Sequence, residues 1–202
     1  RCLVLRVFCS FVFTLSSVSS LYAHINIDQI AKSQLHHEPY EWTMINELFN
    51  PIEADKIAIT YPCDHYKTVK GNDGEKGYEY EVRQLIPMGE KRVAYAKELS
   101  PVWQQLTHDL LSDEYRMAMS ELTGIDLSSA PIEVNLFHYG QGAWLGPHLD
   151  LKDKIVTHVL YFNSEWNPRD GGCLTILGSK NIHDAVSIIP PIIGNSSVLV
   201  RS

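Results

Sequence analysis

His148 and Asp150 stand two residues apart, just ahead of a strand-like run at residues 155–163. Residues two apart on extended backbone point to the same face, so an imidazole and a carboxylate in this arrangement suit two adjacent positions on one metal ion. They would supply two of the three ligands of a facial triad. The alternative is a surface turn in which Asp150 binds backbone amides and His148 is merely solvated.

The surrounding residues favour the metal interpretation. Residues 137–147, directly ahead of the pair, contain three glycines and a proline, which suits close approach of backbone to a bound group. From about Pro131 to Ser202 the chain resembles the catalytic core of the iron(II)- and 2-oxoglutarate-dependent dioxygenases of the prolyl 4-hydroxylase type. The matching features, in order, are Tyr139 with its glycines, His148-x-Asp150, the strand end at 160–163, Trp166, and the run 171–176 with its glycine pair.

The resemblance implies roles for six residues. His148 and Asp150 would hold iron(II), Tyr139 and Tyr161 would hydrogen-bond the cosubstrate 2-oxoglutarate, and the apolar walls beside it would be Val159 and Leu174. From the residues alone, Tyr161 could instead fill a sheet face, and Tyr139 could be a packing aromatic.

The activity implied is hydroxylation of an unidentified substrate, either a prolyl or other side chain or a small molecule. Dioxygen would be consumed and 2-oxoglutarate decarboxylated to succinate, with L-ascorbate re-reducing the iron. The expected partner is therefore a small-molecule or peptidyl substrate.

The third iron ligand of the resembling enzymes is not evident. They carry a second His on a later strand, followed by a basic residue for 2-oxoglutarate, whereas residues 195–202 read as a strand cut off in mid-course. We therefore expect a C-terminally truncated and inactive fragment, with both groups beyond Ser202. His183 lies in a polar stretch that favours a loop, and Arg201 follows no second His, so neither is assigned.

Two other classes of function remain open. The chain could be a non-catalytic, cupin-like binding or interaction domain that lacks the second His. It could also be a hydrolase or isomerase in which His148 and Asp150 hold zinc or manganese and metal-bound water performs the chemistry.

Composition limits the function classes further. A chain of 202 residues with 45 % apolar content can bury one substantial core. A net charge of -7 argues against a phosphate-tracking surface, so no nucleic-acid partner is expected. We expect one domain over residues 25–202, with helical support over about 25–130 and an incomplete jelly-roll core over about 131–202. The oligomeric state is not determined by the sequence.

The first 24 residues are ambiguous. Arg1 and Arg6 precede a short apolar run, 7–15, and serine-rich residues follow, which resembles a secretory signal peptide. The segment could equally be artefactual, because the chain lacks an initial Met. It is too short and too interrupted for a stable membrane span. We expect a cytoplasmic protein, or a secreted or periplasmic one if the signal peptide is genuine.

The local patterns predict a mixed α+β fold. Helices are expected from Asn50-Pro51 to about Tyr61, from Ser100-Pro101, and from Ser112 to Gly124. Gly-rich residues 67–80 are expected to form a mobile loop, which is either a substrate lid or a plain solvated hairpin or loop. The expected short strands are 132–139, 155–163, 173–177, 185–189 and 196–201. Helices followed by short strands suit a double-stranded β-helix, or cupin-like jelly roll, with the N-terminal helices packed on one face.

Overall fold

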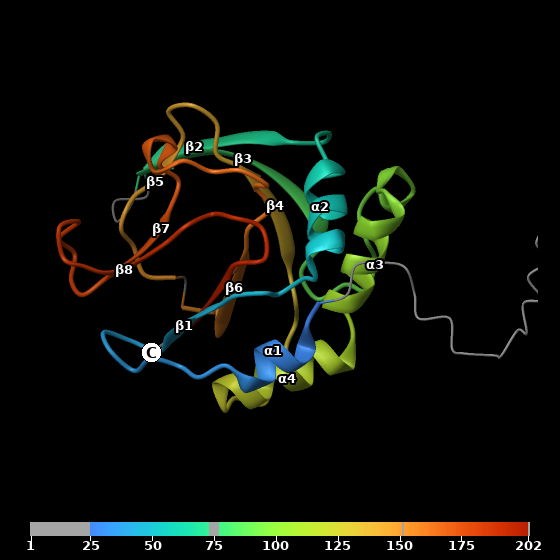
Figure 1. The fold of residues 1–202 in the computed structure, drawn as a ribbon, viewed down its shortest axis with the longest axis horizontal. Helices are drawn as coiled ribbons and strands as arrows, with labels where there is room; N and C mark the ends of the chain where they lie inside the picture. Colours follow the sequence, from blue (N-terminus) through green and yellow to red (C-terminus); the bar gives the residue numbers. More distant parts are fainter. Residues whose placement is uncertain (1–24, 73–76, 151, 202) are drawn as a thin grey trace, which may run out of the picture.

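The α-helices gather on one side of the molecule and most of the strands on the other (Figure 1). The structure is a computed structural model that describes residues 25–72, 77–150 and 152–201. Its helices are α1 (Ile27–Lys32), α2 (Pro51–Ile59), α3 (Pro101–Leu110) and α4 (Asp113–Thr123), with 3-10 helices η1 (Ala96–Glu98) and η2 (Pro168–Asp170). The predicted mixed α+β class is confirmed.

The three predicted helix starts are confirmed by their caps. The side chains of Asn50, Ser100 and Ser112 accept hydrogen bonds from the backbone three residues later, which satisfies an amide that the helix leaves unpaired. A proline follows the cap in both α2 and α3. At the other end of α4, Gly124 adopts φ 70°, a left-handed conformation that closes helices readily because glycine has no Cβ.

The named strands of the described residues pair in antiparallel fashion. One sheet has the order β1 (Trp42–Ile45), β9 (Ser196–Val200), β6 (Val156–Leu160). A second joins β2 (Lys67–Asn72), β3 (Gly77–Ile86) and β4 (Val134–His138), with β5 (Trp144–Leu145) also on β3. The strands β7 (Leu174–Leu177) and β8 (Ala185–Ile189) form a hairpin of their own. In the described ranges the three sheets do not close into one barrel, so the predicted jelly roll is not confirmed at that level of detail.

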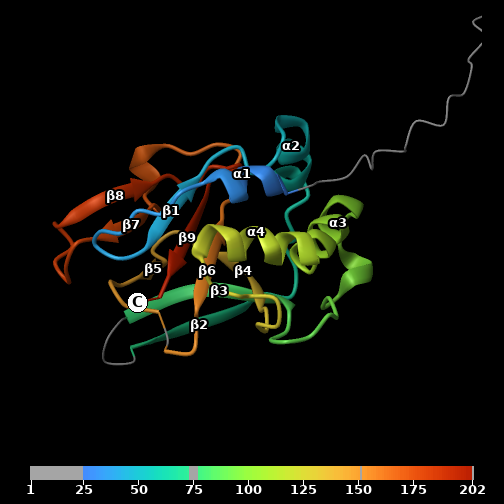
Figure 2. The same ribbon diagram turned by 90° about the horizontal axis from the view of Figure 1, so that it is seen from below.

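The main core lies between the helices and the first two sheets. Its fully buried members include Leu106 of α3, Leu85 of β3 and Val198 of β9. Helix α4 packs beside α1 (Figure 2). A smaller cluster on the far side of the β1–β9–β6 sheet contains Trp42, Ile176 and Ile189. The sheet therefore separates a helix-facing side from a hairpin-facing side.

Strands replace the mobile loop expected at residues 67–80. Lys67 pairs with Val82 and Gly71 with Tyr78, so this region is a hairpin, the plainer of the two alternatives, although residues 73–76 lie outside the described ranges. Strands β1 to β3 also fall within the segment expected to give helical support. The predicted signal-like segment 1–24 lies outside the described residues. In the described part of the chain, no helix has the length and apolar character needed to cross a membrane.

His158 of β6 lies on the helix-facing side of the sheet. Its Nδ1 lies 2.8 Å from the hydroxyl of Tyr115 on α4. Its Nε2 is buried and has no hydrogen-bond partner among the described residues, although the residue as a whole is partly exposed. Burial disfavours the charged imidazolium and lowers the pKa of His158 to about 4. The ring is therefore neutral near pH 7.

We predict that His158 makes the fold acid-sensitive. Because its pKa is lower in the folded state than in the unfolded state, the unfolded chain binds more protons, and stability falls as the pH drops from about 6.5 toward 4. Urea unfolding at pH 7 and pH 5 should show a loss larger by up to about 2 kcal/mol in the wild type than in His158→Gln. Equal losses in the two proteins would contradict this account.

Candidate functional site

Strand β6 presents alternate residues to its two sides. On β9, Leu199 pairs with Thr157 and Ser197 pairs with Val159. Thr157 and Val159 point to the side of the sheet opposite to His158. Just past the strand, Tyr161 packs against the small cluster around Trp42, on the hairpin-facing side. The predicted Val159 and Tyr161 therefore share the sheet face that looks away from the helices.

Tyr161 and Leu174 are brought together by the small cluster. Both pack against Trp42, Ile176 and Ile189. The hydroxyl of Tyr161 lies 3.2 Å from that of Ser197, and burial raises the pKa of Tyr161 to about 12. The hydroxyl is therefore protonated near neutral pH and can donate a hydrogen bond.

Asp150 is held by the same face of β6. The hydroxyl of Thr157 donates to its carboxylate at 2.6 Å, and the ammonium of Lys154 lies 3.5 Å from the other carboxylate oxygen. The guanidinium of Arg201 donates to the backbone carbonyl of Asp150. Arg201, unassigned from the sequence, thus fixes the backbone that carries the carboxylate.

His148 is exposed, and its ring orientation is fixed. Its Nδ1 lies 2.8 Å from the carbonyl oxygen of Gly146. A carbonyl can only accept, so Nδ1 carries the proton, and in the neutral ring the lone pair is on Nε2. A His that donates one ring N–H to a backbone carbonyl while the other nitrogen is free is the usual state of a metal-binding imidazole.

Tyr139 lies apart from the other predicted residues. Its ring neighbours are Tyr80 and Phe137, at centroid distances of 5.6 and 6.4 Å, and the side chain is 46 % exposed. Partial burial and the neighbouring Tyr80 raise the pKa of Tyr139 to about 12. No contact joins this aromatic group to Tyr161 among the interactions of the described residues.

A third ligand for His148 and Asp150 is not found in the described ranges. His183 lies exposed in a turn, as the sequence predicts. Within these ranges, the one group of three or more metal-ligating side chains consists of Asp64, His65 and Glu98, which sequence reasoning missed. Asp64 and His65 are adjacent, but Glu98 lies 33 residues further along the chain, so no local pattern could have revealed the group.

A second set of residues missed from the sequence lies on the outer face of α4. The exposed residues of this helix follow helical spacing and form one stripe, which we call the α4 stripe: Asp113, Glu114, Met117 and Glu121. Met117 is 69 % exposed and carries the only large apolar side chain of the stripe. The result is a solvent-facing methionine flanked by three carboxylates.

The basic residue of α4 is turned away from this stripe. Arg116 donates to the carbonyl oxygens of Leu127 and Ala130, at 3.2 and 2.6 Å. A pocket of about 280 Å³ adjoins the N-terminal end of α4, lined by Ile25, Ile27, Gln105, His108, Asp109, Ser112 and Glu114. Acidic side chains thus line both the stripe and the pocket.

Comparison with known families finds a similarity that includes α3 and α4. A model of the DnaB-helicase binding domain of primase matches residues 89–128, which include η1, α3 and α4. The match spans about a fifth of the chain and describes this segment only. No curated protein matches the chain.

The match corrects the resemblance expected from the sequence. The family found is not an iron(II)- and 2-oxoglutarate-dependent oxygenase, so the predicted hydroxylase function and enzyme class are overturned. The same finding overturns the expected small-molecule or peptidyl substrate. The motif His148-x-Asp150 had suggested the oxygenase because it combines a short pattern with a β-rich context, and both occur in other proteins. The match covers neither His148 nor Asp150 and does not bear on what these two side chains bind.

Proposed function

We propose that the chain is a protein-binding domain whose segment 89–128 docks onto a DnaB-type helicase. The carrying observation is the match of this segment to the DnaB-helicase binding domain of primase. Its two main helices bury one face in the core and leave the other in solvent, so the segment is held rigidly and remains accessible. The non-catalytic interaction domain considered from the sequence is the related alternative.

The chemistry of the α4 stripe supports a basic, partly apolar partner surface. Asp113, Glu114 and Glu121 surround Met117, and Arg116 is occupied with backbone carbonyls. Carboxylates around an apolar contact steer a positively charged partner and fix its register. Methionine adapts its unbranched side chain to the shape that it meets.

The proposed helicase binding also implies a cellular location. A helicase that binds primase works where DNA is replicated, so we propose a cytoplasmic protein. The proposal concerns binding alone and assigns no reaction to the segment.

We predict that reversing charge on the α4 stripe weakens helicase binding. The double variant Glu114→Lys and Glu121→Lys replaces attraction with repulsion toward a basic partner, so the dissociation constant should rise about tenfold or more. Biolayer interferometry with purified DnaB-type helicase, at two salt concentrations, measures this change. The wild-type affinity should fall with added salt.

The matched control carries the same charge change on the other half of the chain. Asp153 and Glu165 are exposed residues of the β-rich half, and Asp153→Lys with Glu165→Lys should bind like the wild type. If the wild type does not bind the helicase, or if both double variants lose affinity equally, the docking proposal is wrong.

A second candidate function is divalent metal binding by His148 and Asp150. It is supported by the tautomer that Gly146 imposes on His148 and by the hydrogen bond that orients the carboxylate of Asp150. An imidazole nitrogen and a carboxylate oxygen suit ions such as Mn²⁺, Zn²⁺ or Fe²⁺. Lys154 competes with such an ion for the carboxylate. Iron(II), 2-oxoglutarate, dioxygen and L-ascorbate as cofactors stay a prediction.

We predict that Mn²⁺ broadens NMR signals selectively around this pair. The amides of Thr157 and Val159 should broaden in the wild type, because Thr157 contacts Asp150. They should broaden far less in His148→Ala. His183→Ala serves as the control, since that exposed His lies in a turn and should leave the broadening unchanged. Equal broadening in the wild type and His148→Ala would contradict metal binding at this pair.

We further propose that the sheets form an open jelly roll. The position of β9 between β1 and β6, and the β7–β8 hairpin packed across that sheet, support this arrangement. In it, Val159, Tyr161 and Leu174 would line the space between the two layers. Residues 25–202 would then be one domain, with the helices supporting its β core.

A further inference from the structure

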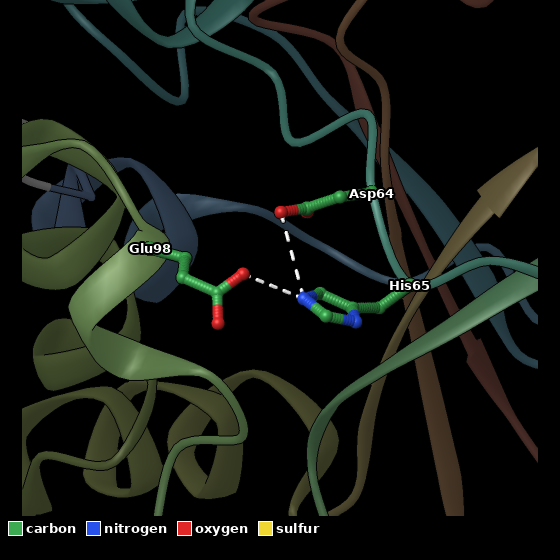
Figure 3. A group of neighbouring side chains, drawn as sticks. All are labelled: Asp64, His65 and Glu98. Atoms are coloured by element: carbon green, nitrogen blue, oxygen red, sulfur yellow. Dashed lines mark hydrogen bonds and ion pairs between the residues drawn. The ribbon is translucent and has the colours of Figure 1, made fainter.

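Three ligand-bearing side chains converge at the junction between the helices and the second sheet (Figure 3). Asp64 and His65 lie in the connection between α2 and β2, and Glu98 is the last residue of η1. The Nε2 atom of His65 lies 2.6 Å from Glu98 Oε2 and 3.6 Å from Asp64 Oδ2. The three ligand atoms all lie within 4.8 Å of one another.

A proton on His65 does not account for the arrangement. One N–H at Nε2 donates one good hydrogen bond, and Glu98 accepts it at 2.6 Å. Asp64 Oδ2, at 3.6 Å, is beyond hydrogen-bond reach of the same nitrogen. A single cation between the three atoms would use both carboxylates together with the nitrogen lone pair.

The buried guanidinium of Arg83 provides an independent observation. Arg83 on β3 is 1 % exposed, and none of its three nitrogens has a hydrogen-bond partner in the described part of the chain. Its Nη1 lies 3.5 Å from Asp64 Oδ1. A buried guanidinium without hydrogen bonds is costly, and the ion pair with Asp64 directs this one toward the cluster.

The two carboxylate oxygens of Asp64 have different neighbours. Oδ1 faces the guanidinium, and Oδ2 faces His65. Carboxylates that bind metal ions commonly have their second oxygen held in this way, which fixes the first toward the ion. Asp64 thus has the orientation that a metal ligand requires.

The ring of His65 is fixed as well. It stacks on Tyr95, with centroids 3.7 Å apart and planes 3° from parallel. The side chains of His65, Asp64 and Glu98 are 32, 45 and 48 % exposed, so an ion and its water ligands can reach them from solvent. One nitrogen and two carboxylate oxygens form a donor set that suits Zn²⁺, with water completing the coordination.

We propose that Asp64, His65 and Glu98 form a zinc site. Glu98 belongs to segment 89–128, whereas Asp64 and His65 precede the second sheet, so a bound ion ties the two regions together. Glu98 lies 33 residues from His65, and folding is needed to bring it to the adjacent Asp64 and His65, so the ion binds the folded chain in preference to the unfolded one.

Zinc titration of the 202-residue chain tests the site. The experiment uses a His148→Ala background, which removes the other candidate metal ligand. Isothermal titration calorimetry should give one zinc ion per chain, and His65→Ala should weaken binding at least tenfold. Glu98→Gln, which keeps the shape of the side chain and removes its charge, should weaken binding in the same direction.

The matched control is His37→Ala. His37 is an exposed histidine with its Nδ1 3.4 Å from Glu41, and no third ligand joins this pair among the described residues. Its loss should leave zinc affinity unchanged. Zinc should also raise the melting temperature of the background protein but not of His65→Ala. Absence of zinc binding, or equal affinity in the His65→Ala and His37→Ala proteins, would overturn the proposal.

Discussion

Burial of Trp103 is the interaction on which the rest of the structure depends. Its side chain is fully buried, its indole N–H donates to the carbonyl of Ile57 on α2 at 3.0 Å, and its ring packs against Tyr61 and Phe162. A fully buried Trp contributes several kcal/mol to stability. One side chain thus joins α2, α3 and the end of β6. Because α3 is fixed, α4 must present one face to the core and the other to solvent.

Much of the local structure could be predicted from the sequence because its causes are local. Capping by Asn50, Ser100 and Ser112 and the left-handed Gly124 depend on residues within one helical turn. The predicted strand at residues 185–189 coincides with β8. Strand pairing could not be predicted, because β9 lies between β1 and β6 through contacts that span most of the chain. Residues 67–80 were expected to be a loop because glycine and charge were weighted above the alternation Tyr78, Tyr80, Val82.

The candidate sites also contain parts that the sequence could predict and parts that it could not. Tyr161 and Leu174 both pack against the small cluster around Trp42, so that part of the predicted site lies at one cluster. The α4 stripe did have a sequence signal, since Met117 and Glu121 are four residues apart and out of phase with the buried Tyr115, Met119 and Leu122. A helix that packs against a core also has an outer face, and the outer residues of α4 repeat with the same helical spacing as the buried ones. The cluster of Asp64, His65 and Glu98 had no local signal, because Glu98 lies 33 residues beyond His65, with strands β2 and β3 between them.

The molecule therefore combines an acidic helix surface with a β-rich half. We propose that the helix surface docks onto a helicase. Hydrogen–deuterium exchange of the chain, with and without DnaB-type helicase, tests this most directly. The account predicts protection confined to residues 89–128, strongest along α4, with the amides of β6 and β9 unchanged. Protection centred on the β-rich half, or none in residues 89–128, would contradict it.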